Sequence, residues 1–315
     1  MTSVLVTGGA GFIGSHVADA YLAAGFSVTV LDDLSTGRRE NVPREARFVR
    51  ADVGSLEARD LLTDGGFTVV NHHAAQVDVR VSVSDPVLDA RINLLGLLNL
   101  LEGARRGGVR QVIFASSGGV VYDERSPLPH REEAPKLPLS PYGVSKLASE
   151  YYLAAQARLY GLEVVSLRYA NVYGPRQNPH GEAGVVAIFG SRLRAGRALT
   201  IFGDGEQTRD YVYVEDVARA NLAATRAPVG ALESVDAAAF NVGTGVETSV
   251  NQLARLMLQA SGSTVPVTHE PARAGELQRS ALDCAKAARL WDWRPAVSLT
   301  EGLRRTYDWI GEVAA

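Results

Sequence analysis

Tyrosine and lysine stand four residues apart in the segment SPYGVSK, which spans residues 140–146. That spacing places Tyr142 and Lys146 one turn apart on the same face of a helix. A phenol with a pKa of about 10 is a poor base at neutral pH, but a nearby positive charge stabilises its phenolate form. The pair therefore has the chemistry of a base that takes a proton from a substrate and of the cation that activates this base.

Lysine is rare in this chain, so its position is informative. The 315 residues include 32 basic side chains, of which only Lys136, Lys146 and Lys286 are lysines and 29 are arginines. A chain that uses arginine almost everywhere is expected to keep lysine where arginine would fail. Arginine supplies a positive charge but not a compact ammonium group. We therefore predict a chemical role for Lys146 and assign none to the other two lysines.

A third candidate lies where a predicted strand, residues 110–116, ends in the sequence FASSGG. In open α/β folds, ligands bind at the carboxyl ends of the strands. A serine hydroxyl at this place would orient a substrate hydroxyl and share its proton with Tyr142. Two questions stay open: whether Ser116 or Ser117 faces the substrate, with Ser117 preferred, and whether the hydroxyl only bonds the backbone at a strand end.

A glycine-rich turn lies near the start of the chain. The segment TGGAGFIG has the pattern G-x-x-G-x-x-G at Gly8, Gly11 and Gly14, between a strand-like run at 3–6 and a helical pattern at 12–24. Glycine permits the tight turn and lets a pyrophosphate approach the backbone at the start of the helix. The turn therefore predicts a dinucleotide site.

Asp32 ends the next strand-like run, residues 26–32. A carboxylate at this place accepts hydrogen bonds from the adenosine ribose hydroxyls and repels a 2'-phosphate, which favours NAD over NADP. Arg38 and Arg39 follow closely, so NADP is kept as an alternative. We predict NAD as the cofactor.

Six short apolar runs alternate with helical patterns over the first 170 residues, and these elements must position the candidate side chains. The runs lie at 3–6, 26–32, 46–52, 67–72, 110–116 and 162–170, and the main helical patterns at 12–24, 85–106 and 141–160. Strands separated by helices predict a parallel sheet with helices on both faces. We predict an α/β fold with a doubly wound parallel sheet of the Rossmann type.

The alternation of strands and helices loosens after residue 171. Residues 171–184 are rich in Gly, Pro and Asn, which predicts a long irregular loop. Helical patterns follow at 183–194, 214–226, 249–260 and 299–310, with strand candidates at 198–202 and 239–243. We predict a dinucleotide-binding domain at 1–170, to which about 204–245 returns, and a smaller interleaved α/β substrate lobe formed by about 171–203 and 246–315.

Composition excludes several classes of protein. A net charge of −3 provides no basic field for nucleic acid, and 46% hydrophobic with 21% charged residues is typical of a globular chain. Cys284 is the only cysteine, which excludes an internal disulfide and a cysteine zinc site, and no metal site is predicted.

The most apolar helical stretch, 94–104, is too short to cross a membrane, and the N-terminus lacks the features of a signal peptide. We predict a cytoplasmic protein without nucleic acid or membrane partners.

The chain resembles the extended short-chain dehydrogenase/reductase superfamily over essentially its whole length. The resemblance is carried by Asp32 and by the segments TGGAGFIG, SSGGVVY, YGVSK and RYANVYGPRQ. Within it, the sequence is most similar to UDP-glucose 4-epimerases, also called UDP-galactose 4-epimerases. The resemblance implies tightly held NAD, removal of a hydride from carbon 4 of a nucleotide-bound hexose, rotation of the 4-keto intermediate and return of the hydride to its other face. It makes Tyr142 the base, Lys146 the residue that activates this base and binds the nicotinamide ribose, and Ser117 the residue whose hydroxyl assists Tyr142.

The resemblance also implies two sets of binding residues and a homodimer packed through the long helices at about 85–106 and 142–160. A guanidinium group suits the diphosphate because it can donate two parallel hydrogen bonds. The residues implied for NAD are Gly8, Gly11, Phe12, Ile13, Gly14, Asp32, Asp33, Asp52, Val53, Ala74, Ala75, Asn93, Tyr142 and Lys146. Those implied for a UDP-hexose or another nucleoside diphosphate sugar are Ser117, Asn171, Arg176, Arg209, Arg273 and Glu276.

Other activities of the superfamily are alternatives. Dehydratases carry a Thr-Asp-Glu triplet where this chain has Ser117, Gly118 and Gly119, so the extra acid and base for eliminating water are missing. A UDP-glucuronate 4-epimerase needs the same chemistry plus a carboxylate site and stays open. Ser280 stands where a bulky aromatic narrows the sugar pocket of stricter enzymes, which predicts tolerance of N-acetylhexosamines. A dehydrogenase with net NADH release and a non-catalytic NAD-binding protein are less favoured hypotheses.

Overall fold

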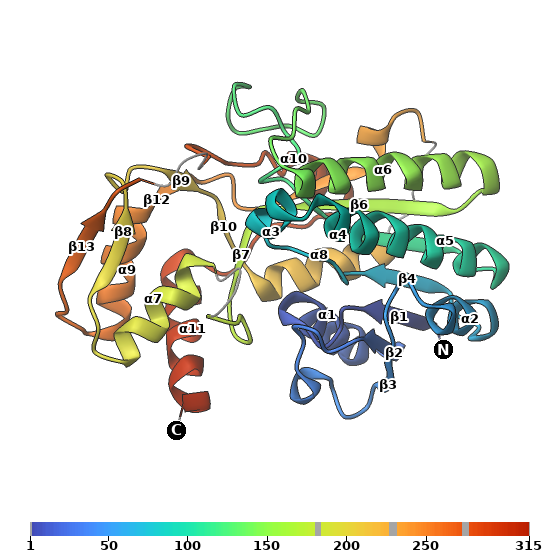
Figure 1. Cartoon of the computed structure of the whole chain (residues 1–315), viewed down its shortest axis with the longest axis horizontal. Helices are drawn as coiled ribbons and strands as arrows, with labels where there is room; N and C mark the ends of the chain where they lie inside the picture. The colour runs from blue at the N-terminus through green and yellow to red at the C-terminus, as the bar shows by residue number, and fades with distance from the viewer. Residues whose placement is uncertain (1, 180–183, 227–231, 273–276, 315) are drawn as a thin grey trace.

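Seven short apolar runs form the central sheet of this computed structural model, which describes residues 2–179, 184–226, 232–272 and 277–314. The strands are β1 (Ser3–Thr7), β2 (Ser27–Asp32), β3 (Arg47–Arg50), β4 (Val69–His72), β5 (Gln111–Ser117), β6 (Glu163–Tyr169) and β11 (Ala239–Val242). Every neighbouring pair is parallel, and the order across the sheet is β11-β6-β5-β4-β1-β2-β3 (Figure 1). Parallel strands are buried on both faces, which explains the consecutive apolar residues in the inner strands, whereas the edge strand β3 is exposed at Arg47 and Arg50. The predicted doubly wound parallel sheet is confirmed.

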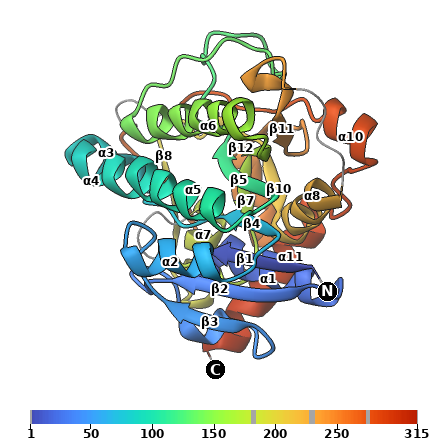
Figure 2. The ribbon, with the colours of Figure 1, turned by 90° about the vertical axis from the view of Figure 1, so that its right-hand side faces the viewer.

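Two layers of helices bury the two faces of the sheet (Figure 2). On one face, α1 (Phe12–Ala23) packs against α8 (Val214–Arg226). The other face is covered by α2 (Leu56–Asp64), α5 (Gly96–Arg106) and α6 (Pro141–Tyr160). Because successive strand residues point to opposite faces, Val4 joins the first layer and Leu5 joins the second. This layering brings the carboxyl ends of the strands to one edge, where the candidate side chains lie.

The segment before α5 includes the start of the single helix predicted over 85–106. It forms α3 (Val79–Ser84), α4 (Pro86–Ala90) and a π-helical segment η2 (Arg91–Leu95), which leads into α5. Asp85 separates α3 from α4 because it precedes a proline and its side chain caps α4 by accepting from the amide of Leu88 (2.9 Å). The helix predicted over 85–106 is confirmed, since helical residues run without a break from Pro86 to Arg106, and the one irregularity is the π-helical turn, a feature frequent at functional sites.

The stretch after β6 is also more regular than predicted. Its first residues form β7 (Asn171–Tyr173), which pairs in parallel with β10 (Tyr211–Tyr213), so the prediction of a loop throughout 171–184 is wrong. This pairing joins segments far apart in the sequence, and a local pattern does not reveal it. The other small elements are the antiparallel strands β9 (Thr208–Arg209) and β12 (Thr248–Ser249) and the 3₁₀ turns η1 (Arg39–Asn41) and η3 (Val235–Ala237).

A smaller lobe with its own apolar core lies to the left of the sheet in Figure 1. Its helices are α7 (Val185–Arg194), α9 (Val250–Ser261) and α11 (Leu299–Ala314), and its strands β8 (Leu199–Phe202) and β13 (Val267–Glu270) form a parallel pair. The helix α10 (Ala285–Trp291) instead packs on β11, where Trp291 stacks on Phe240. The chain therefore passes between the sheet and the lobe more than once.

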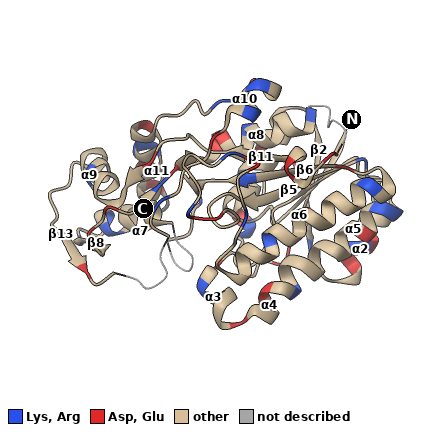
Figure 3. Ribbon diagram, turned by 90° about the horizontal axis from the view of Figure 1, so that it is seen from above, with Lys and Arg blue, Asp and Glu red and all other residues tan. Residues whose placement is uncertain are grey.

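Charges of both signs are interspersed along the surface helices (Figure 3). On α5, for example, Arg105 and Arg106 both pair with Glu102. No helix in the described ranges is long and apolar enough to cross a membrane.

Candidate active site

The helix α6 carries two of the predicted catalytic side chains. It begins after Ser140, whose hydroxyl accepts a hydrogen bond from the amide of Gly143 (3.1 Å), with Pro141 as the first helical residue. Tyr142 is half-buried in the first turn, and Lys146 is buried one turn later. The ammonium nitrogen of Lys146 lies 5.7 Å from the centre of the Tyr142 ring. The structure brings the predicted pair together.

The ammonium group of Lys146 lies among apolar and acidic neighbours. Its Nζ donates to the carbonyl oxygen of Ala115 (2.8 Å) and lies 4.7 Å from the centre of the Phe114 ring. Burial lowers the pKa of Lys146 to about 8, although the nearby carboxylates of Asp89 and Glu150 oppose this shift. At neutral pH the side chain is therefore mainly protonated, and its charge can stabilise a phenolate at Tyr142.

The two serines at the end of β5 have different surroundings. Ser116 is buried, and its hydroxyl donates to the carboxylate of Glu150 (2.5 Å). Ser117 is half-buried, and its hydroxyl has no hydrogen-bond partner among the described residues. A side chain on Gly143 would meet the carbonyl oxygen of Val120 at 2.6 Å, so the start of α6 packs directly on the loop that follows Ser117. This geometry favours Ser117 for contact with a substrate hydroxyl, and that role stays a prediction.

The glycine turn after β1 has the shape that a bound pyrophosphate needs. Gly8 has a left-handed φ of 67°, and a side chain there would meet the backbone nitrogen of Ala74 at 2.5 Å. The helix α1 begins directly after Gly11, which supplies no side-chain cap to the first amides of the helix. Such amides bind anions at the positive end of the helix dipole, so the turn fits the pyrophosphate of NAD. The first turn consists of Phe12, Ile13 and Gly14.

Asp32 is buried and shapes the glycine turn itself. Its carboxylate accepts hydrogen bonds from the amides of Ala10 (2.9 Å) and Leu34 (2.8 Å). Burial raises the pKa of Asp32, and these two hydrogen bonds oppose the rise. Each carboxylate oxygen can accept a second hydrogen bond, so the predicted contact with ribose hydroxyls is compatible with this geometry. Arg38 and Arg39 are both exposed.

The other residues predicted to contact NAD follow β2, β3 and β4. Asp33 and Asp52 are exposed, and each accepts a hydrogen bond from the backbone amide two residues later (2.8 and 2.7 Å). Val53 is buried, and Ala74 and Ala75 are half-buried. These residues come from loops at the carboxyl edge of the sheet, and their contact with NAD stays a prediction.

The side chain of Asn93 is used inside the protein. Its amide nitrogen donates to the backbone oxygen of Gln76 (3.0 Å) and to the carboxylate of Asp89 (2.9 Å), and its oxygen accepts from the amide of Gln76 (2.9 Å). Asn93 therefore holds the loop after β4, which also carries Ala74 and Ala75. A direct contact of Asn93 with NAD stays a prediction.

The residues predicted to bind the sugar nucleotide lie in segments of the chain after β6. Asn171 is exposed at the start of β7, and the guanidinium of Arg209 donates to the preceding carbonyl oxygen (2.8 Å). Ser280, which was predicted to widen the sugar pocket, is buried. Arg273 and Glu276 lie outside the described residues.

Arg176 contacts the first helix of the sheet domain. Its guanidinium lies 2.7 Å from the carboxylate of Asp19 on α1, and its backbone has a left-handed φ of 66°. The ring of His16, also on α1, lies 3.1 Å from the carbonyl oxygen of Pro175. These contacts tie the loop after β7 to α1. The pair with Asp19 uses Nη1, so the other N–H groups of the guanidinium can still donate to a diphosphate, and that contact stays a prediction.

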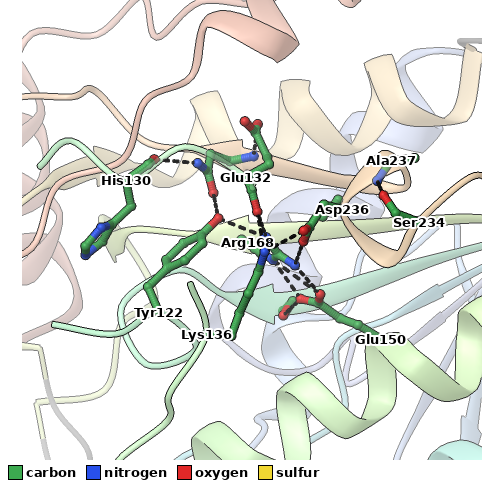
Figure 4. Close-up of polar contacts among 12 residues, drawn as sticks. Tyr122, His130, Glu132, Lys136, Glu150, Arg168, Ser234, Asp236 and Ala237 are labelled. Atoms are coloured by element: carbon green, nitrogen blue, oxygen red, sulfur yellow. Dashed lines mark hydrogen bonds and ion pairs between the residues drawn. The ribbon is translucent and has the colours of Figure 1, made fainter. Parts of the chain in front are cut away.

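Behind the candidate site lies a buried ion pair that is not predicted from the sequence (Figure 4). Arg168 on β6 and Glu150 on α6 are both fully buried, and their side chains lie 2.6 Å apart. The guanidinium also donates to the Tyr122 hydroxyl (3.0 Å) and the Glu132 carbonyl oxygen (2.8 Å), and it pairs with Asp236 (2.9 Å). Burial opposes the charge of Arg168, but Glu150 and Tyr122 raise its pKa above the usual range. An arginine within a run of mainly apolar residues is the sequence signal for such a pair.

The two lysines without a predicted role hold the same region. The ammonium of Lys286 donates to the carbonyl oxygens of Asp236 (2.7 Å), Ala237 (3.0 Å) and Ala239 (2.7 Å). Lys136 pairs with the carboxylate of Asp236 (2.6 Å). The three donors of an ammonium diverge from one atom, whereas those of a guanidinium lie in one plane. Lys286 therefore stands where arginine would fit poorly.

The amino-terminal three quarters of the chain carry a recognisable family pattern. Residues 4–243 match the model of the NAD dependent epimerase/dehydratase family. The chain belongs to this family. The family resemblance predicted from the motifs is confirmed, and so is NAD as the cofactor.

Several members of the NAD dependent epimerase/dehydratase family are similar to this chain over its whole length. The UDP-glucose 4-epimerase of Mycolicibacterium smegmatis is 46% identical, covering 96% of this chain and 97% of its own. The crystal structure of the Thermotoga maritima UDP-glucose 4-epimerase with UDP-glucose is 45% identical and covers 100% of both chains with a TM-score of 0.95. The crystal structure of the Thermus thermophilus UDP-glucose 4-epimerase in complex with NAD is 47% identical. It covers 98% of this chain and 99% of its own, with a TM-score of 0.90. The likeness therefore includes the lobe as well as the sheet.

Proposed function

We propose that the protein is an NAD-dependent epimerase that interconverts UDP-glucose and UDP-galactose by transient oxidation at carbon 4 of the sugar. The observation that carries the proposal is the pair on α6, where the buried ammonium of Lys146 lies 5.7 Å from the ring centre of Tyr142. The fit of the glycine turn to NAD and the likeness to solved UDP-glucose 4-epimerases support the same reaction.

In this proposal, Tyr142 is the base for the hydroxyl on carbon 4. Lys146 stabilises the phenolate because it is buried yet mainly protonated at neutral pH. The hydroxyl of Ser117 bonds the same substrate oxygen and directs its proton to Tyr142. Bound NAD supplies the hydride acceptor and donor. After the sugar has turned, Tyr142 returns the proton, so the same three side chains serve both directions.

Two parts of the chain share the binding. Residues 1–170 with about 204–245 hold NAD, chiefly through the glycine turn and Asp32. About 171–203 and 246–315 hold the nucleoside diphosphate sugar. The candidates for contact with this ligand within the described residues are Ser117, Asn171, Arg176 and Arg209, and Arg273 and Glu276 complete the predicted set.

The outer face of α6 supports a homodimer. Val144, Tyr151, Tyr152 and Leu159 are exposed and recur at helical spacing, which gives α6 an apolar stripe away from the core. Large exposed apolar patches commonly mark protein interfaces. We propose a dimer packed through the long helices of a cytoplasmic enzyme of galactose metabolism. Sedimentation should show a dimer that Tyr151→Arg converts to a monomer, and a wild-type monomer would exclude it.

The test of the activity is incubation of the purified protein with UDP-galactose, UDP-N-acetylgalactosamine or UDP-glucuronate, without added NAD. Many turnovers of UDP-galactose are expected. Turnover of the N-acetylated sugar would support the pocket hypothesis at Ser280, and exclusive turnover of UDP-glucuronate would favour the alternative epimerase. Stoichiometric NADH release would identify a dehydrogenase and contradict the proposal.

Tyr142→Phe supplies the control on mechanism. It should nearly abolish epimerisation while NAD stays bound, because it removes only the hydroxyl that accepts the proton. Tyr160→Phe, the same change at an exposed position at the end of α6, should keep full activity. A full rate for Tyr142→Phe would remove Tyr142 from the mechanism.

A further inference from the structure

Asp89 lies at the centre of a buried polar cluster to which the proposed chemistry assigns no role. Its side chain on α4 is 0% exposed. Three side chains donate to its carboxylate: Gln76 through Nε2 (3.1 Å), Asn93 through Nδ2 (2.9 Å) and Ser145 through Oγ (2.5 Å). A buried carboxylate is costly unless hydrogen bonds and a counter-charge compensate it. The cluster therefore raises the question of which cation balances Asp89.

The three donors come from three separate parts of the candidate site. Gln76 belongs to the loop after β4, and Asn93 belongs to the π-helical segment η2. Ser145 directly precedes Lys146 on α6. One carboxylate thus joins the loop predicted to line the cofactor to the helix that carries the predicted base.

The donors to Asp89 are neutral, so they leave its negative charge uncompensated. Lys146 directly follows Ser145, which holds Asp89, and it is buried, so its ammonium is the cation that the fold places beside this cluster. Asp89 and Glu150 are the two carboxylates that oppose the lowering of the pKa of Lys146. Glu150 already has a contact ion pair with Arg168 at 2.6 Å. Of the two carboxylates near Lys146, Asp89 is therefore the one whose charge is left to balance the ammonium.

We propose that Asp89 is a positioning residue for the reaction, whose charge keeps Lys146 protonated beside Tyr142 and whose hydrogen bonds lock the loop after β4 to α6. Its kinetic consequences rest on the proposed function, whereas its relation to Lys146 does not. Asp89 acts through the charge of Lys146 and through its tie to α6, so its effect on catalysis is independent of any contact with the sugar.

The other titratable groups near Lys146 do not replace the charge of Asp89. They are Tyr142 and Glu150 on α6, His72 on β4 and His73 directly after β4. Burial lowers the pKa of both histidines to about 3, so their rings are neutral at neutral pH. Without the charge of Asp89, the pKa of Lys146 should therefore fall below its value of about 8.

The scarcity of lysine permits a direct measurement on the holoenzyme. Lysine labelled with carbon-13 at Cε gives signals from only three residues, and Lys136→Arg and Lys286→Arg leave the third signal assigned to Lys146. In Asp89→Asn, which keeps the shape but removes the charge, the pKa of Lys146 should be lower by about one unit, a tenfold change in proton binding. Asp85→Asn, the same change at an exposed cap of α4, should leave it unaltered. An unaltered Lys146 pKa in Asp89→Asn would overturn the proposal.

Kinetics with UDP-galactose give the second measurement. For Asp89→Asn, kcat should fall about twofold at pH 7 and about tenfold at pH 9 with little change in KM, because the alkaline limb of the kcat profile moves to lower pH. Ser145→Ala keeps the charge and removes the tie to α6. It should lower kcat a few-fold without moving that limb, and it decides the question if Asp89→Asn does not fold, since an unchanged kcat would overturn the positioning role. If the wild type epimerises no sugar, the proposed function fails while the titration still decides the role of Asp89.

Discussion

Replacing Arg168 by methionine should destabilise the protein strongly, because the change leaves a buried carboxylate without its counter-charge. Methionine fills much of the space of the arginine stem and offers no donor. Glu150 would keep the hydroxyl of Ser116 as a donor but lose the guanidinium that lies 2.6 Å away. The Tyr122 hydroxyl and the Glu132 carbonyl oxygen would each lose a hydrogen bond as well.

Burial sets the size of this effect. Both side chains of the Arg168–Glu150 pair are 0% exposed, and removing one partner of such a pair costs about 3–5 kcal/mol. The Arg110–Glu163 pair has nearly the same length, 2.7 Å, but its side chains are 50% and 34% exposed. Arg110→Met is therefore the matched control and should cost no more than about 1 kcal/mol. Combining Arg168→Met with Glu150→Leu should recover part of the loss, because both buried charges are then removed.

Urea unfolding, followed by tryptophan fluorescence, measures the free energy of unfolding of each variant. The slope of this free energy with urea concentration is compared among the variants, because equal slopes mean that the variants differ in stability alone. A loss for Arg168→Met within about 1 kcal/mol of that for Arg110→Met would refute the reasoning. Such a result would mean that burial does not decide what each ion pair contributes.

Lys146→Arg keeps the positive charge but not the compact ammonium, so kcat should fall at least about 100-fold while NAD stays bound, as steady-state kinetics and cofactor analysis would show. Lys286→Met removes the donor to three carbonyl oxygens and should lower the free energy of unfolding by about 1–3 kcal/mol in urea, with only partial recovery in Lys286→Arg. Burial lowers the pKa of His72 and His73 from 6.5 to about 3, so between these pH values only the unfolded chain protonates the two rings. The free energy of unfolding should therefore fall as the pH drops through this window, by up to about 1.4 kcal/mol per pH unit and ring, and His72→Gln should make urea unfolding less dependent on pH.

The catalytic helix could be predicted because its signals are local. A serine cap, a proline in the first turn and a glycine stop bracket α6, and helical spacing alone places Tyr142 next to Lys146. The glycine turn and Asp32 are local in the same sense, since β1, the turn and β2 follow one another in the chain. Even so, the sequence does not show that Asp32 bonds the amide of Ala10 and so shapes the turn that it adjoins.

The buried charges could not be predicted, because their partners are distant in the sequence. Arg168 meets Glu150 and Asp236 only after β6, α6 and η3 have come together. Hydrophobic periodicity indicates which residues are buried, not which buried polar groups pair. The same limit hides Asp89, whose three donors come from a loop, a π-helical segment and α6.

The place of β11 has a consequence for the chain as it leaves the ribosome. Residues 239–242 complete the sheet beside β6, although the other six strands have all been made by residue 169. A nascent chain therefore carries an open edge at β6 while some seventy further residues are translated, and unpaired edges invite aggregation. Asp236, which pairs with Arg168, arrives just before β11. Chains interrupted before residue 239 should depend on chaperones, and the sheet can close only after the first part of the lobe has been synthesised.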